Sequence, residues 1–200
     1  MDDHPYRGRS DRAGVAREVM ATTARFQLLA ADIALPSYPI DVEFVRWSAE
    51  AATENNCPGP VADVTRRFEA DDAWLRSLGD YVVGHGDVHF WNAVSVHPEG
   101  PWRLIDPIPR TAHWAWDAAY AQMTSGVPET PDLIRLLAPE RQRLGLPVCG
   151  IDEIDAITVV LLGWTSMMWW ALLPGRRGDA WWSGEVQRHV EELADLGDQG

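Results

Sequence analysis

The chain of 200 residues contains no lysine, and all 17 of its basic residues are arginine. This absence excludes reactions that need a lysine, from Schiff-base chemistry to phosphate binding by a Walker A loop. Basic residues are also few, because the 17 arginines face 30 Asp and Glu residues and leave a net charge of −13. A nucleic-acid backbone needs a basic footprint, so we expect no nucleic-acid partner. A cationic small molecule matches this charge better.

Cysteine is scarce as well. Cys57 and Cys149 are the only two, which is too few for a disulfide framework or a cysteine-based zinc site. The first ten residues lack the apolar region of a secretory signal peptide. We therefore expect a reducing, cytoplasmic location, with a single bridge between the two cysteines as the open alternative.

One long apolar run tests the expectation of a soluble protein. Ala156–Leu173 has 18 residues without a charge, which is the lower limit for crossing a bilayer. Gly163, Thr158 and Thr165 dilute its hydrophobicity, and no second run or basic loop accompanies it. The run therefore predicts a buried central helix and no membrane partner.

Most of the chain has the apolar periodicity of helices. The clearest stripe predicts a helix that ends before Pro36, and its members are Val15, Val19, Thr22, Phe26, Leu29 and Ile33. A weaker pattern covers residues 42–52, and a third runs over 61–78 before Gly79. Later helices are expected over 112–125 and from Thr130, Asp152 and Asp179.

The middle of the chain is different. Tyr81–Val83, Ala93–Val96 and Trp102–Ile105 are short β-prone runs, and a five-residue turn separates the last two. That spacing predicts a hairpin. The fold class is therefore mainly α (α+β), with one small β-hairpin inside a single domain over residues 1–200.

Polar side chains gather at the two ends of this hairpin. Asp87 and Asn92 stand five residues apart where the chain enters it, and Asp106 directly follows the exit strand. A hairpin brings its ends together, so these three side chains can converge. Two carboxylates and one amide oxygen suit Mg²⁺ and suit zinc poorly. The alternative is that these residues serve only turns and caps.

The same residues carry a family resemblance. His85-Gly86-Asp87-x-His89-x-x-Asn92, followed by Ile105-Asp106-Pro107, resembles the aminoglycoside phosphotransferase family, which is related to protein kinases. The stretch Pro101–Ala119 looks most like the streptomycin/hydroxyurea kinase branch. The resemblance is specific over residues 84–119. It implies a protein-kinase-like C-terminal lobe whose catalytic element is the hairpin. The family's N-terminal nucleotide-binding lobe, with its glycine-rich loop and lysine, has no counterpart here, so a separate polypeptide could supply it.

The resemblance assigns a role to each matching residue. Asp87 would orient the acceptor hydroxyl and take its proton, while Asn92 and Asp106 would hold Mg²⁺ against the phosphates of ATP, the co-substrate. His85 would brace the loop by hydrogen bonds, and His89 would support it.

A second group of residues surrounds this centre. The resemblance implies that Asp117 accepts bonds from the loop backbone. Trp91, Trp114 and Trp116 could line an acceptor pocket, where aromatic rings stack on sugars or contact cations. Ile108 departs from the branch, which usually carries a basic residue at that position.

The resemblance implies ATP- and Mg²⁺-dependent phosphoryl transfer to a hydroxyl of a small, cationic molecule such as an aminoglycoside, and hence a role in antibiotic resistance. One alternative is a non-catalytic, truncated kinase-like module that binds a ligand without turnover. A second alternative is a metal-dependent hydrolase, in which the alternating residues His85, Asp87 and His89 would share one face of a strand.

Overall fold

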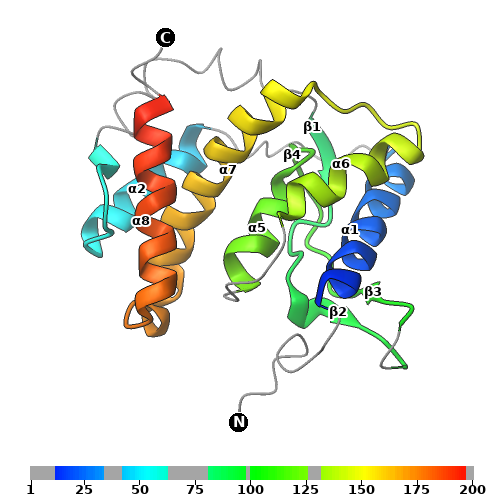
Figure 1. Ribbon diagram of the computed structural model, residues 1–200, viewed down its shortest axis with the longest axis horizontal. Helices are drawn as coiled ribbons and strands as arrows, with labels where there is room; N and C mark the ends of the chain where they lie inside the picture. Colours follow the sequence, from blue (N-terminus) through cyan, green and yellow to red (C-terminus); the bar gives the residue numbers. More distant parts are fainter. Residues whose placement is uncertain (1–11, 34–41, 63–80, 98–99, 126–131, 197–200) are drawn as a thin grey trace. The chain divides into compact units, whose positions relative to one another are not determined.

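A computed structural model describes residues 12–33, 42–62, 81–97, 100–125 and 132–196. The chain divides into two compact units, each discontinuous in sequence (Figure 1). The first comprises Met1–Pro39 and Asp80–Cys149, and the second comprises Ile40–Gly79 and Gly150–Gly200. The described residues are mostly helical with short antiparallel strands, which confirms the mainly α prediction. All of the candidate site residues belong to the first unit.

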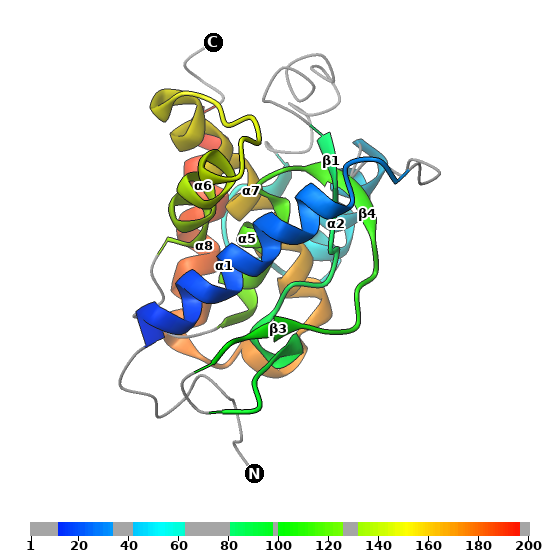
Figure 2. The same cartoon turned by 90° about the vertical axis from the view of Figure 1, so that its right-hand side faces the viewer.

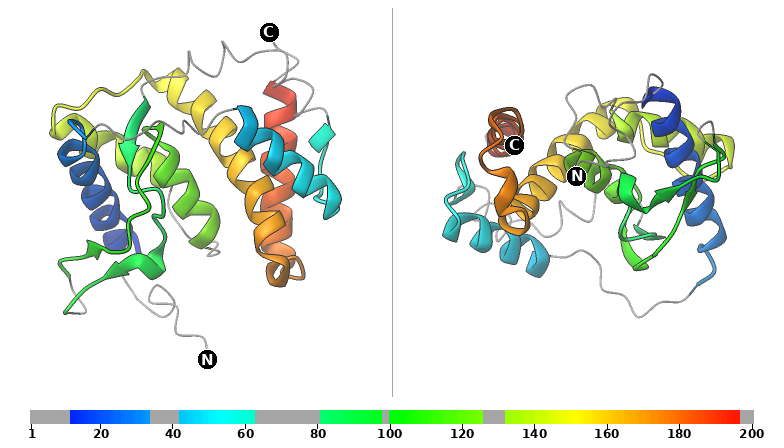
Figure 3. Two further views of the ribbon diagram at one scale, coloured as in Figure 1. Left: turned by 180° about the vertical axis from the view of Figure 1, so that it is seen from behind. Right: turned by 90° about the horizontal axis from the view of Figure 1, so that it is seen from below.

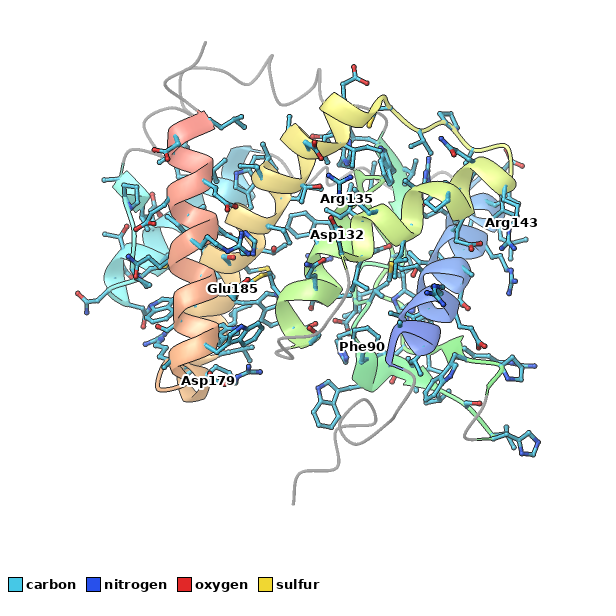
Figure 4. All side chains as sticks on the ribbon, in the orientation of Figure 1. Phe90, Asp132, Arg135, Arg143, Asp179 and Glu185 are labelled. Carbon is cyan, nitrogen blue, oxygen red and sulfur yellow. The ribbon has the colours of Figure 1, made fainter. Side chains whose placement is uncertain are left out.

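Three helices form the frame of the first unit: α1 (Arg12–Leu29), α5 (Trp116–Ser125) and α6 (Leu133–Arg143). Helix α6 packs against both α1 and α5. Its N-terminus is capped by the side chain of Asp132, which accepts a bond from the Arg135 N–H at 3.1 Å and lies beside it in Figure 4.

A buried polar cluster joins α1 to α6. Arg141 is fully buried, and its guanidinium lies 5.1 Å from the ring centroid of Trp114. The guanidinium also donates to the Gln27 side chain and, at 2.9 Å, to the Pro147 carbonyl. Gln27 in turn donates to the Trp114 carbonyl at 2.8 Å. These bonds satisfy the buried charge and hold the segment that leads into α5.

The predicted stripe on the first helix is right at its start and wrong at its end. Val15 and Val19 are buried, but Leu29 is 81 % exposed and Ile33 is 51 % exposed. The helix ends at Leu29, and the buried residues of its last turns are Ala24 and Gln27. The breaker Pro36 lies outside the described residues.

Among its described residues, the first unit also contains two small antiparallel sheets. Strand β2 (Ala93–Val94) pairs with β3 (Arg103–Leu104), which confirms the predicted hairpin in a shorter form. Strand β1 (Tyr81–Gly84) pairs with β4 (Arg110–His113), with Val83 opposite Thr111. Helix α1 lies against β1 and β3, as Figure 2 shows.

Strand β4 corrects the sequence prediction, which began a helix at Ala112. Helix α5 begins only at Trp116, four residues later. The partner of β4 is Tyr81–Gly84, about thirty residues earlier in the chain. Pairing with that strand satisfies the backbone groups of Arg110–His113, so tertiary pairing overrides the local helical pattern.

The second unit is a helical packing of α2 (Val42–Glu54), α7 (Ile151–Leu172) and α8 (Ala180–Asp195), with α7 in contact with both of the others (Figure 3). A single 3-10 turn, Pro174–Arg176, links α7 to α8. The indole of Trp170 stacks on that of Trp182 at 5.6 Å and donates to the Asn55 carbonyl. The predicted third helix over residues 61–78 lies almost wholly outside the described residues.

Helix α7 contains the apolar run noted in the sequence. Within the described part of the chain, Glu153–Leu172 is the one helical segment long and apolar enough to cross a membrane. However, 61 % of the apolar stretch within this segment is buried inside the protein, and Trp164 and Met167 are among its buried residues. A mostly buried helix of this kind is what the core of a helical unit requires.

Candidate active site

The site is built on the loop that leaves strand β1. Its backbone is held by Asp117 in the first turn of α5, whose two carboxylate oxygens accept the N–H groups of His85 and Gly86, both at 2.9 Å. From the other side, the Ile108 N–H donates to the His85 carbonyl at 2.9 Å. The predicted role of Asp117 as an acceptor for this backbone agrees with these contacts.

Gly86 is required by this close packing. Its φ is +80°, in the left-handed region that favours glycine. A Cβ at this position would lie 1.9 Å from the carbonyl oxygen of Ile108. The residue before Asp87 is therefore glycine for two independent reasons.

Burial makes Asp117 an unusual carboxyl. Its side chain is 2 % exposed, and burial raises its pKa from 3.8 to about 6. The hydrogen bonds from Gly86 and His85 oppose this rise, and the nearby charge of Asp87 adds to it. Asp117 therefore ionises near neutral pH while holding the loop.

Asp87 is the centre of the polar contacts. The Asn92 amide donates to its backbone carbonyl at 3.1 Å and to its Oδ2 at 2.9 Å. The Tyr120 hydroxyl donates to Oδ1 at 2.8 Å, and the His89 Nε2 lies 3.6 Å from Oδ2. The Asp87 side chain remains 20 % exposed, so its carboxylate is held and is still accessible from solvent.

Asn92 ends the 3-10 turn η1 (Phe90–Asn92) that enters the hairpin, where Phe90 is labelled in Figure 4. Because its amide nitrogen is bonded to Asp87, its Oδ1 faces away from that bond and can accept another partner. The Asn92 carbonyl accepts the Ile105 N–H at 2.9 Å. The hairpin thus places the backbone of the residue before Asp106 against Asn92, while the convergence of the Asp106 side chain with Asp87 and Asn92 stays a prediction.

Asp106 is exposed and has a φ of +53°. A left-handed conformation costs a non-glycine residue about 1–3 kcal/mol, and such conformations gather at functional sites. Its carboxylate is close enough to His85 to act on the pKa of that ring. The turn therefore presents an exposed carboxylate at the exit of the hairpin.

Burial affects the protonation of both histidines of the loop, His85 and His89. Burial lowers the pKa of His85, although Asp87, the Ile105 carbonyl and Asp106 oppose the shift. Burial likewise lowers the pKa of His89, against the effect of Asp87. Neither charge is therefore available at neutral pH.

The predicted bracing of the loop by hydrogen bonds of the His85 ring stays a prediction, because the Ile105 carbonyl lies close enough to raise the pKa of the ring. In the part of the chain that the structure describes, neither ring nitrogen has a partner at full hydrogen-bonding geometry. The ring is 1 % exposed and packs edge-on against Phe26 with centroids 5.3 Å apart. His85 supports the loop by packing and through its backbone.

The three tryptophans expected to line an acceptor pocket differ in their exposure to solvent. Trp91 is 54 % exposed, next to Asn92, and presents its ring to solvent. Trp114 and Trp116 are 1 % and 4 % exposed and lie in the core. Only Trp91 therefore has surface to offer a ligand in this structure.

Tyr120 is the contact that the sequence reasoning missed. It lies three residues after Asp117 on α5, so both side chains point to one face of the helix. That spacing is the signal that could have identified it once Asp117 was placed against the loop.

The donor set fits Mg²⁺ better than zinc. Among the described residues, no group of three or more His, Cys, Asp or Glu side chains could hold a metal ion. Asn92 Oδ1 and the Asp106 carboxylate are hard oxygen donors, and Mg²⁺ is commonly held by few protein ligands, with water and phosphate oxygens completing its shell. The hydrolase alternative loses its premise, because strand β1 ends at Gly84 and His85, Asp87 and His89 follow it in a loop.

In comparisons with known proteins, no family model, no curated protein and no solved structure matches the chain.

Proposed function

We propose that this chain is a kinase-like phosphotransferase lobe, which transfers the γ-phosphoryl group of ATP to a hydroxyl of a small cationic molecule of the aminoglycoside type. The observation that carries the proposal is the pair of hydrogen bonds that the Asn92 side-chain amide donates to Asp87, at 3.1 Å to the backbone carbonyl and at 2.9 Å to the carboxylate. This arrangement holds a potential base and directs an amide oxygen outward, as a phosphoryl-transfer site requires.

The chemistry assigns one task to each side chain. The acceptor oxygen attacks the γ-phosphorus, its proton passes to the Asp87 carboxylate, and the bond from the γ-phosphorus to the β,γ-bridging oxygen breaks to release ADP. Asn92 and Asp106 would hold Mg²⁺, which when bound neutralises charge on the phosphates. Most of the catalytic effect then comes from positioning and charge neutralisation.

The charge of the chain and the exposure of Trp91 support the proposed acceptor class. The chain has a net charge of −13, which attracts a cation, and Trp91 beside Asn92 offers an exposed ring on which a sugar or an amine can rest. Antibiotic resistance is the biological role that this substrate class suggests.

The second candidate is a binding module without turnover. The observation that favours it is the lack of any lysine, since kinase-like enzymes use one to hold the α- and β-phosphates. The loop, Asp87, Asn92 and Asp106 would then bind Mg²⁺ or a ligand and transfer nothing.

One assay separates the two candidates. The purified chain is incubated with ATP, Mg²⁺ and a panel of aminoglycosides, and phosphorylated product is sought by mass spectrometry. Product formation that is lost in Asp87→Asn supports the transferase. The matched control is Asp195→Asn, which removes one exposed carboxylate from the other unit. Binding of Mg²⁺ that needs Asp106, without product from any acceptor, supports the binding module.

A further inference from the structure

The carboxylate of Asp87 has two donors on its two different oxygens. Tyr120 of α5 donates to Oδ1 at 2.8 Å, and Asn92 of η1 donates to Oδ2 at 2.9 Å. A carboxylate held at one oxygen can turn about its Cβ–Cγ bond, whereas donors on both oxygens set its plane. The plane decides where the remaining lone pairs point.

The two donors come from elements that pack on each other. Helix α5 contacts η1, and α5 also supplies Asp117, which holds the backbone of the same loop. Helix α5 therefore holds the backbone of the loop through Asp117 and the side chain of Asp87 through Tyr120.

The hydroxyl of Tyr120 is a permanent donor. Burial raises the pKa of Tyr120, the bond to Asp87 raises it further, and Arg110 opposes the rise. The phenol stays protonated at any pH near neutrality, so it donates to Asp87 and does not compete with it as a base.

We propose that Tyr120 is a positioning residue for Asp87. The Tyr120 hydroxyl fixes the plane of the Asp87 carboxylate, so that the remaining lone pairs of the carboxylate face the acceptor hydroxyl. Each carboxylate oxygen has about two lone-pair sites. Among the described residues, Tyr120 and Asn92 occupy one on each oxygen, and the other site on each oxygen is left for the incoming proton. The effect of Tyr120 on turnover rests on the proposed phosphotransferase function, whereas its effect on the orientation of the Asp87 carboxylate does not.

Tyr120→Phe removes the hydroxyl and keeps the ring. If Tyr120 positions the base, kcat falls about 10-fold to 100-fold while the KM of the acceptor stays within about twofold, because a bond that acts only on orientation affects the transition state more than binding. The matched control is Tyr81→Phe, in strand β1 of the same unit, where the ring faces His113. We expect Tyr81→Phe to leave kcat unchanged.

A second readout needs no turnover. The side-chain amide signals of Asn92 in a ¹H–¹⁵N NMR spectrum report its bond to Asp87. Tyr120→Phe should shift these signals, Tyr81→Phe should leave them in place, and Tyr120→Phe added to Asp87→Asn should give a much smaller shift, because Tyr120 acts through the carboxylate.

Two results would overturn the proposal: Asn92 signals that stay in place in Tyr120→Phe, or a kcat within about twofold of the wild-type value. If the wild-type chain phosphorylates no acceptor, the phosphotransferase function fails, and the Asn92 signals still decide whether Tyr120 holds Asp87.

Discussion

Replacing Asp117 by asparagine removes a buried carboxyl, and the effect on stability should depend on pH. The folded protein holds the pKa of Asp117 at about 6, against 3.8 for an ordinary aspartate. The difference of about two pKa units corresponds to about 3 kcal/mol between the two protonation states. This is a large fraction of the stability of a typical domain.

The sign follows from the direction of the shift. Because the folded state binds the proton more tightly than the unfolded state, the contribution to stability is complete below the unfolded pKa of 3.8 and is lost as the pH rises through about 6. Asparagine has no such proton. The free energy of unfolding of the wild type, relative to Asp117→Asn, should therefore fall by about 3 kcal/mol between about pH 4 and pH 7.5.

The measurement is urea unfolding followed by tryptophan fluorescence over this pH range, since the chain has 11 tryptophans. The control is Asp195→Asn, which removes an exposed carboxylate from the other unit. A wild-type-minus-variant difference that stays flat across the range, or that grows with pH, would refute the reasoning from burial.

Two substitutions of glycine test the packing, and a third serves as their control. Gly86→Ala should destabilise the protein by more than about 2 kcal/mol, because a left-handed alanine costs about 1–2 kcal/mol and its Cβ would meet the Ile108 carbonyl at 1.9 Å. Gly163→Ala in α7 should destabilise by about 1–3 kcal/mol despite the better helix propensity of alanine, since its Cβ would lie 2.5 Å from the Leu193 side chain. The exposed Gly184 of α8 has nothing within 4 Å of an added Cβ, so Gly184→Ala should stabilise by about 0.5–1 kcal/mol. Urea midpoints check all three, and a stabilised Gly163→Ala would contradict the packing of α7 on α8.

Helices and the hairpin could be predicted because their signals are local. Asp179 and the apolar run that starts near Asp152 mark two helices that the structure contains as α8 and α7. Strand β4 could not be predicted in this way. Four residues are too few to establish a period, and their partner strand lies about thirty residues away in the chain.

The candidate site also contains one contact that local spacing predicts and others that depend on tertiary packing. The contact of Asn92 with Asp87 follows from a five-residue spacing at the start of a hairpin. The bond from Tyr120 depends on how α5 packs against the loop, which no short pattern encodes. The burial of Trp114 similarly depends on Arg141, 27 residues further along the chain.

The central claim is that Asp87 and Asp106 perform Mg²⁺-dependent phosphoryl transfer, and the most direct test is the rate of acceptor phosphorylation by the wild type and by Asp87→Asn and Asp106→Asn. We expect phosphorylation by the wild type that requires Mg²⁺. Asp87→Asn should lose at least about 100-fold, the lower range for removing a positioned base, and Asp106→Asn should lose a similar factor, because a bound metal ion supplies several kcal/mol of charge stabilisation. Equal Mg²⁺-dependent rates in the wild type and both variants would contradict the claim.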